Sequence, residues 1–205
     1  MSELMFNKYS LHEVFSNQEK TMAQHINSLQ RERLLTTSLE NLEKEILDQF
    51  MVHAPQIAED QASVSDAEVD LDVSQDPLLG TWWDRSRPMI RKGTRYSLHI
   101  PYSGDRNLFW AQPSTTNFNP PSAEVNSGEV IYSVEGVGLA PERIKAAFDQ
   151  FKNNLSFYLE HVRGDVQAFN SKLPDLIKRR LRGREAKIKQ DQSVASQLGY
   201  PIKQS

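Results

Sequence analysis

The sequence predicts an α+β fold, with N-terminal helices, a central antiparallel sheet and two long C-terminal helices. Two patterns carry this prediction. Apolar residues recur every three or four positions near the N-terminus and in the C-terminal third, which is the spacing of a helix with one buried face. Between these regions apolar and polar residues alternate, as in strands with one buried face. The expected boundaries are 1–55 for the helical segment, 56–138 for the sheet and 139–200 for the helical pair.

The N-terminal segment is expected to contain two helices within residues 20–51. Thr36, Thr37 and Ser38 favour a turn between them. Ser38 is a suitable N-cap for the second helix, and Glu40 complements the helix dipole in its first turn. The preceding stretch, from Tyr9 to Phe15, is predicted to form a short helix or a clip.

The central sheet is expected to contain four or five antiparallel strands. Two of them show strict alternation of apolar and polar residues, at Ala67–Val73 and Arg95–Ile100. The tripeptide Asn126-Ser127-Gly128 provides a turn that would join two further strands into a hairpin. The remaining predicted strands are Leu108–Gln112, Ser122–Val125 and Glu129–Val134.

The C-terminal third begins with Pro141, which suits the first turn of a helix because a missing N–H costs nothing there. The apolar stripe of this helix consists of Ile144, Phe148, Phe151, Leu155, Tyr158, Val162, Val166 and Phe169. Asn170 and Ser171 interrupt the pattern, and Pro174 lies in the first turn of a second helix. That second helix has a weaker apolar face and is expected to end at Gly199.

Composition excludes several classes of function. The 205 residues include no Cys, which rules out disulfides, thiolate catalysis and Cys-ligated zinc. The N-terminus lacks an apolar signal core, and no run approaches the roughly 20 apolar residues of a membrane span. We therefore expect a cytoplasmic protein without membrane association. No nucleophile elbow, Walker loop or dinucleotide-binding glycine motif is present, so no cofactor and no enzymatic activity are expected.

Charge is distributed unevenly along the chain. Residues 53–83 contain seven acidic residues and no Lys or Arg, whereas residues 172–189 contain eight bases against two acids. Opposite charge in two blocks indicates internal docking, head-to-tail contact between copies, or two separate solvated faces. The basic block supplies the predicted interaction residues Lys178, Arg179, Arg180, Arg182, Arg184, Lys187 and Lys189. Its arginines do not share one helical face and no aromatic residue accompanies them, which argues against stacking on single strands and leaves contact through charge alone, with nucleic acid or with an acidic protein surface.

Two further groups are weaker candidates. Trp82, Trp83, Arg85 and Arg87 form a possible ligand loop in which indoles and guanidinium groups could stack on a ligand, although packing of such Trp residues against the sheet is the more common arrangement. Glu68, Asp70 and Asp72 share one face of a predicted strand and could hold Mg²⁺ or Ca²⁺. A solvent-exposed face, or an acceptor for the basic helix, is the favoured interpretation. The five His are dispersed along the chain, and no metal site is predicted.

Several strings resemble an amino-terminal module of uncharacterised bacterial proteins. They are Thr94-Arg95-x-x-x-His99-Ile100-Pro101-Tyr102-Ser103-Gly104-Asp105, Gln112-Pro113-Ser114-Thr115, Phe118-Asn119-Pro120-Pro121, Phe169-Asn170-x-x-Leu173-Pro174 and Leu198-Gly199-Tyr200-Pro201. In such proteins a restriction-endonuclease-like or TIR effector domain often follows, in architectures similar to those of anti-phage defence systems. The resemblance implies no catalytic residues within the module.

Taken with this resemblance, the sequence favours a non-enzymatic sensor or scaffold module that assembles with itself or with an effector. The first alternative is a nucleic-acid-binding module that uses the basic C-terminal helix. The second is a metal-dependent nuclease that uses the acidic strand around Asp70.

Overall fold

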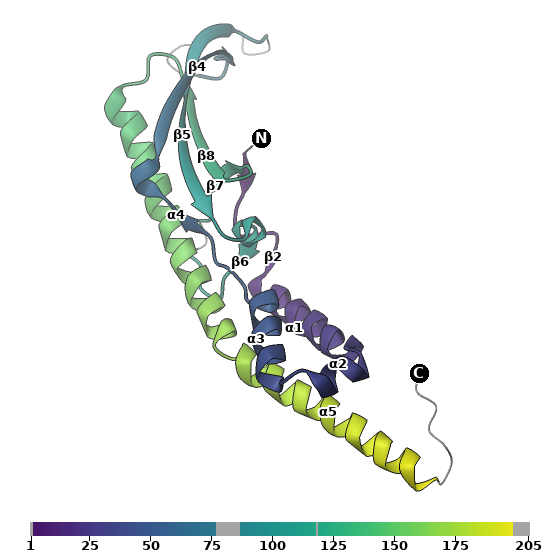
Figure 1. Ribbon diagram of the computed structural model, residues 1–205. Coiled ribbons are helices and arrows are strands. Elements are labelled where there is room, and N and C mark those ends of the chain that lie inside the picture. The colour runs from purple at the N-terminus through teal and green to yellow at the C-terminus, as the bar shows by residue number, and fades with distance from the viewer. Residues whose placement is uncertain (1, 77–86, 118, 199–205) are drawn as a thin grey trace. The chain divides into compact units, whose positions relative to one another are not determined.

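The computed structural model describes residues 2–76, 87–117 and 119–198, and it confirms the predicted α+β fold (Figure 1). The chain divides into two compact units. Unit 1 contains Met1–Tyr9 and Ala54–Arg163, and unit 2 contains Ser10–His53 and Gly164–Ser205. Each unit is described by itself below.

Unit 1 is built on an antiparallel sheet of six strands centred on β5 (Ile90–Ser103). One side of β5 pairs with β8 (Glu129–Gly136), which continues to the rest of the sheet. The other side pairs with β4 (Ser63–Asp72) along ten residues and then with β3 (Gln56–Ile57). The sheet is completed by β7 (Ser122–Val125) and β1 (Glu3–Leu4). Its two extra strands, β1 and β3, are only two residues long, which explains why the sequence predicted fewer.

The hairpin between β7 and β8 forms at the predicted turn, where Gly128 has a φ of 95°. The predicted strand Leu108–Gln112 is wrong in its first half, which belongs to a 3₁₀ helix at Arg106–Phe109. The side chain of Asp105 accepts a hydrogen bond from the N–H of Asn107, and this local bond favours a helical turn. Only β6 (Ala111–Gln112) is extended there, and another two-residue strand, β2 (Tyr9–Ser10), precedes the first helix.

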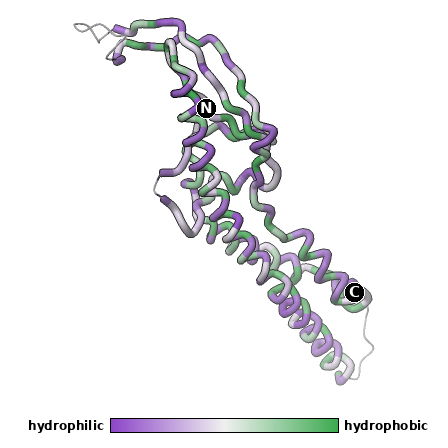
Figure 2. Tube along the Cα trace, turned by 90° about the vertical axis from the view of Figure 1, so that its left-hand side faces the viewer, coloured by the Kyte–Doolittle hydropathy of each residue, from purple (hydrophilic) through white to green (hydrophobic). Residues whose placement is uncertain are grey.

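The core of unit 1 lies between one face of the sheet and α4 (Pro141–Asn170). The ring of Tyr132 on β8 stacks on that of Phe151, with centroids 4.3 Å apart and an angle of 3°. Tyr158 on the same helix stacks on Phe6 at 5.0 Å. The predicted apolar stripe is confirmed, since seven of its eight residues are buried and Ile144 is half-buried. In Figure 2, hydrophobic and hydrophilic residues recur in short turns along the long helices.

Unit 2 is helical. Its elements are α1 (Leu11–Ser28), α2 (Arg31–Thr36), α3 (Leu39–Phe50), the end of α4, and α5 (Leu173–Gln197). The predicted cap at Ser38 is confirmed, because its side chain accepts a hydrogen bond from the N–H of Asn41. Ser10 and Glu13 form a capping box at the start of α1, so the stretch expected as a short helix or clip opens an 18-residue helix.

One apolar core joins the two ends of the sequence within unit 2. The fully covered residues of α5 are Leu173, Ile177, Leu181 and Ile188, at helical spacing. They pack with residues of the N-terminal helices, namely Met22, Ile26, Leu29, Leu34, Leu42, Ile46 and Phe50. Phe15 stacks on Phe169 at 4.5 Å and extends this core to the end of α4. In the described part of the chain, no helix combines the length and the apolar character that crossing a membrane requires.

The break between α4 and α5 is fixed by Asn170. Its Oδ1 accepts a hydrogen bond from the backbone N–H of Val52 at 3.1 Å, and its Nδ2 donates one to the Val52 carbonyl at 2.8 Å. The Asn170 side chain therefore satisfies both the backbone N–H and the backbone carbonyl of Val52, which follows α3. The predicted interruption is confirmed, and Pro174 lies in the first turn of α5 as expected.

We expect Asn170→Asp to lower the free energy of unfolding of unit 2 by about 1–3 kcal/mol. The carboxylate would lose the donor and set an oxygen against the Val52 carbonyl. Urea denaturation followed by far-ultraviolet circular dichroism measures the change. Gln167→Glu makes the same chemical replacement at an exposed position of α4 and should alter stability by less than about 0.5 kcal/mol. Equal effects from the two variants would contradict a clamping role for Asn170.

Candidate functional site

The basic surface of α5 is the predicted site that the structure describes most completely. It consists of Lys178, Arg179, Arg180, Arg182, Arg184, Lys187 and Lys189. Because Ile177, Leu181 and Ile188 face the core of unit 2, most of the intervening bases are directed away from it. Six of the seven are exposed, and Arg184 is half-buried.

Little of this positive charge is neutralised. Lys189 pairs with Glu185 at 2.6 Å. Among the described residues, none forms an ion pair with Lys178, Arg179, Arg180, Arg182 or Lys187. The Nε of Arg184 is buried and has no hydrogen-bond partner within the described chain. The surface therefore presents free cationic groups on a helix whose opposite side is anchored.

The bases form two rows beside the buried stripe. Lys178, Arg182 and Lys189 are spaced by four and seven residues and lie on one flank of α5. Arg180 and Lys187, seven residues apart, lie on the other flank. This arrangement follows from helical geometry and gives a broad cationic surface without a single reading face.

The acidic strand has a partner that the sequence did not indicate. Lys92, directly opposite Asp70 in the β4–β5 register, places its Nζ 2.9 Å from Asp70 and 3.2 Å from Glu68. Hydrogen bonds with these two carboxylates raise the pKa of Lys92. Asp72 instead accepts hydrogen bonds from the backbone N–H groups of Ser74 and Met89, and the bonds from Ser74 make the largest contribution to lowering its pKa. Within the described residues, no three His, Asp or Glu side chains converge on a possible metal position.

The possible ligand loop lies largely outside the described residues. Trp82, Trp83 and Arg85 belong to the part of the chain that is not described. Arg87 is described and is exposed. Its role in a ligand loop stays a prediction.

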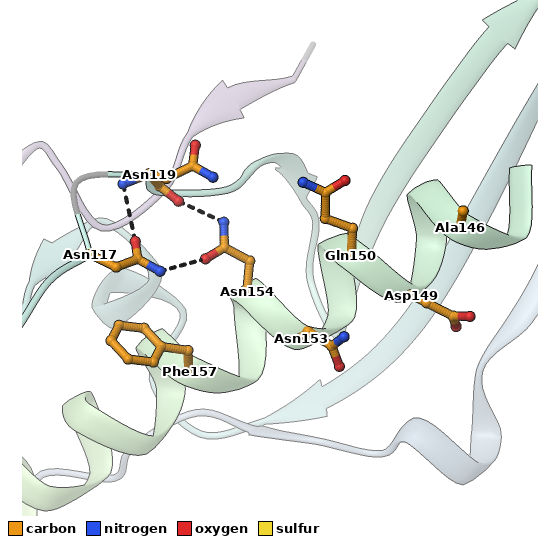
Figure 3. A pocket seen from close by; sticks show the side chains of 8 residues that line it. All are labelled: Asn117, Asn119, Ala146, Asp149, Gln150, Asn153, Asn154 and Phe157. Atoms are coloured by element: carbon orange, nitrogen blue, oxygen red, sulfur yellow. Dashed lines mark hydrogen bonds between the residues drawn. The ribbon is translucent and has the colours of Figure 1, made fainter. Parts of the chain in front are cut away.

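An amide-lined depression in unit 1 was missed at the sequence level (Figure 3). It has a volume of about 580 Å³ and is lined by Asn117, Asn119, Ala146, Asp149, Gln150, Asn153, Asn154 and Phe157. Asn117 donates to the Oδ1 of Asn154 at 3.0 Å, and Asn154 donates to the carbonyl of Asn119 at 2.6 Å. The hydroxyl of Tyr158 also donates to Asn117, at 3.0 Å. These amides hold the loop against α4, so much of their hydrogen-bonding capacity serves the fold rather than a ligand.

No local signal in the sequence marks these amides as a group, because Asn117 and Asn154 come together only when α4 packs on the sheet. Asp149, the one charged residue among the described residues that line the depression, is paired with Lys145 at 2.6 Å and with Lys152 at 3.2 Å. The described lining is therefore polar but offers no free cation for a phosphate.

Comparison with known protein families, with curated proteins and with solved structures gives no match for this chain, so the interpretation of its surfaces depends on their chemistry.

Proposed function

We propose that this chain is a sensor or scaffold module that binds a polyanion, with the phosphate backbone of nucleic acid as the class of ligand, through the basic surface of α5. The observation that carries this proposal is a set of exposed bases that form no ion pair among the described residues, namely Lys178, Arg179, Arg180, Arg182 and Lys187. The resemblance of its sequence strings to modules that precede effector domains supports the sensor or scaffold part of the proposal.

The chemistry of the surface favours a polyanion over a protein partner. Protein interfaces depend on a central group of apolar and aromatic side chains, and charged residues are depleted there. Between Lys178 and Lys189, where every residue is described, no large apolar side chain is exposed. Phosphate groups require only positive charge, supplied here by flexible Lys and Arg side chains. The absence of aromatic residues in this stretch also disfavours base stacking, so contact with the backbone is expected to be independent of sequence.

Replacing Arg179, Arg180, Arg182 and Lys187 by Glu should abolish nucleic-acid binding while leaving unit 2 folded, because exposed charges contribute little to stability. Fluorescence anisotropy with labelled duplexes of random sequence measures binding. If the wild-type protein makes about five phosphate contacts, its affinity should fall roughly 10²–10³-fold between 50 and 200 mM salt. A control variant carries the same change of net charge at the exposed bases Lys20, Lys44, Arg143 and Arg163. Equal loss in both variants would indicate a general charge effect, and retention of binding by the first would refute the proposal.

Self-assembly is the second candidate. It is favoured by the edge strand β4, which pairs among the described strands only with β5. Two exposed apolar residues lie at opposite ends of this pair of strands: Val64 on β4 is 59% exposed, and Ile90 on β5 is 58% exposed. Sedimentation of the wild-type protein and of these charge variants, without nucleic acid, distinguishes self-assembly from polyanion binding. A mass above the 23.5 kDa of one chain that rises with concentration supports assembly, whereas a constant mass together with salt-dependent binding supports the first proposal.

A further inference from the structure

The two faces of the sheet in unit 1 differ in chemistry. Tyr132 belongs to the face that packs on α4. Because side chains alternate along a strand, Ile131 and Ser133 lie on the opposite face, together with the residues aligned with them in register. One such row runs across three strands and consists of Ser65, Ser97 and Ser133. The next row contains His99 opposite Ser63 and Ile131.

On this polar face, three side chains from three strands form a chain of hydrogen bonds. The Oγ of Ser65 on β4 lies 2.9 Å from the Nε2 of His99 on β5. The Nδ1 of the same imidazole lies 3.1 Å from the Oε2 of Glu129 on β8. An ionised carboxylate can only accept, so Nδ1 carries the proton and Nε2 is left with a lone pair. The hydroxyl of Ser65 is then the donor to Nε2.

This is the order of atoms that activates a serine. A carboxylate orients the imidazole, and the imidazole takes the hydroxyl proton as the oxygen attacks. The roles are recognised by geometry rather than by sequence position or fold, so the absence of a nucleophile elbow in the sequence does not exclude them. The three residues are separated along the chain by 34 and 30 positions, which explains why no local motif shows them.

The group is accessible to a reagent. Ser65 is exposed on the edge strand, and the side chains of His99 and Glu129 are 26% and 39% exposed. Hydrogen bonds between exposed groups contribute little to stability, because water competes for the same donors and acceptors. The hydrogen bonds among Ser65, His99 and Glu129 are therefore not explained by a contribution to the stability of the fold.

A donor for a developing negative charge lies in the adjacent row. Ser97, which is directly opposite Ser65, has its Oγ 2.8 Å from that of Ser133. Two hydroxyl groups that share one hydrogen bond retain one O–H proton that is free to donate. Hydroxyl donors of this kind can stabilise the oxyanion of a tetrahedral intermediate.

We propose that Ser65 is an activated nucleophile that accepts an acyl group from an unhindered ester. In the first step the Oγ of Ser65 bonds to the carbonyl carbon, His99 takes the hydroxyl proton and passes it to the departing alcohol, and the ester C–O bond breaks. In the second step His99 takes a proton from water, whose oxygen attacks the acyl-serine, and the acid leaves as the proton returns to Oγ. Glu129 is a positioning residue for His99. This activity is separate from the proposed polyanion binding and uses none of the bases of α5.

A fluorophosphonate probe tests the proposal on the full chain, since the hydroxyl oxygen displaces fluoride from phosphorus and leaves a stable adduct. Peptide mass spectrometry should locate the adduct on Ser65. His99→Gln should slow labelling, and the hydrolysis of p-nitrophenyl acetate, by roughly 10²–10⁴-fold, the usual contribution of a general base. Ser65→Ala should abolish labelling. Ser63→Ala is the matched control, because Ser63 lies on the same face of β4 opposite His99 and should leave the rate unchanged.

The role of Glu129 has its own readout. Glu129 is the charged group in contact with His99. On the same face of the sheet, Arg95 and Glu135 pair with each other at 2.7 Å. Glu124 lies on β7, opposite Ile131. Glu129→Ala should slow labelling, because His99 would lose the carboxylate that holds its Nδ1. Glu129→Asp keeps the carboxylate and should restore labelling at least in part. A Glu129→Ala rate equal to that of the wild type, an adduct on another residue, or a His99→Gln rate within about twofold of wild type would overturn the proposal.

Discussion

Replacing Phe151 with aspartate should unfold unit 1. The ring is 5% exposed and stacks on Tyr132, so a carboxylate there would be buried without a partner between α4 and the sheet. Removal of a buried Phe side chain alone costs about 3–5 kcal/mol, and the buried charge adds to this. Because domains of ordinary stability unfold with about 5–15 kcal/mol, the loss is a large part of the total.

Tryptophan fluorescence measures this effect selectively, because Trp110 belongs to unit 1 and the sequence of unit 2 contains no Trp. The urea midpoint of the fluorescence transition should fall sharply, or the variant should be unfolded without urea. Asn153→Asp introduces the same side chain at an exposed position two residues away and should behave like the wild type. A stable Phe151→Asp protein would mean that the apolar stripe of α4 is not packed against the sheet.

Truncating Leu181 to alanine should destabilise unit 2 by about 3 kcal/mol. The side chain is fully buried among the residues that α5 shares with α1, α2 and α3, so its removal leaves a cavity that packing cannot readily close. Far-ultraviolet circular dichroism during urea denaturation follows the loss of these helices.

Arg182→Ala is the natural comparison, because it truncates the exposed neighbour of Leu181 on the same helix. It should change stability by less than about 0.5 kcal/mol, although we expect it to weaken polyanion binding. If the two substitutions cost the same, the division of α5 into a buried stripe and a basic surface is wrong.

Long periodic patterns made most of the fold predictable. The stripe from Phe148 to Phe169 and the alternation in β4 and β5 extend over many residues, so they indicated a helix and strands before any contact was known. The two-residue strands β1 and β3 contain too few residues for a period, and tertiary pairing with β7 and β5 determines them. At Leu108 and Phe109 two consecutive buried residues break the alternation expected of a strand, and the bond from Asn107 to Asp105 turns the chain.

A candidate site was predictable from the sequence only where all of its residues belong to one helix or strand. The bases of α5 lie close together in sequence on one helix, so helical spacing was enough to expect their exposure. The pairing of Lys92 with Asp70 depends on the register between β4 and β5, and a shift by one residue would place the two side chains on opposite faces. The group of Ser65, His99 and Glu129 depends on two registers at once and lies beyond the reach of local patterns.

The composition of unit 2 has a consequence for how the protein is made. Its core combines helices near the start of the chain with α5, and more than a hundred residues of unit 1 lie between them. At translation rates of about 5–20 residues per second, α3 leaves the ribosome on the order of ten seconds before α5. During that interval the apolar faces of α1 and α3 lack the helix that covers them. Unit 2 therefore completes its folding only after translation of α5, and until then its nascent N-terminal helices expose the apolar residues that α5 later covers.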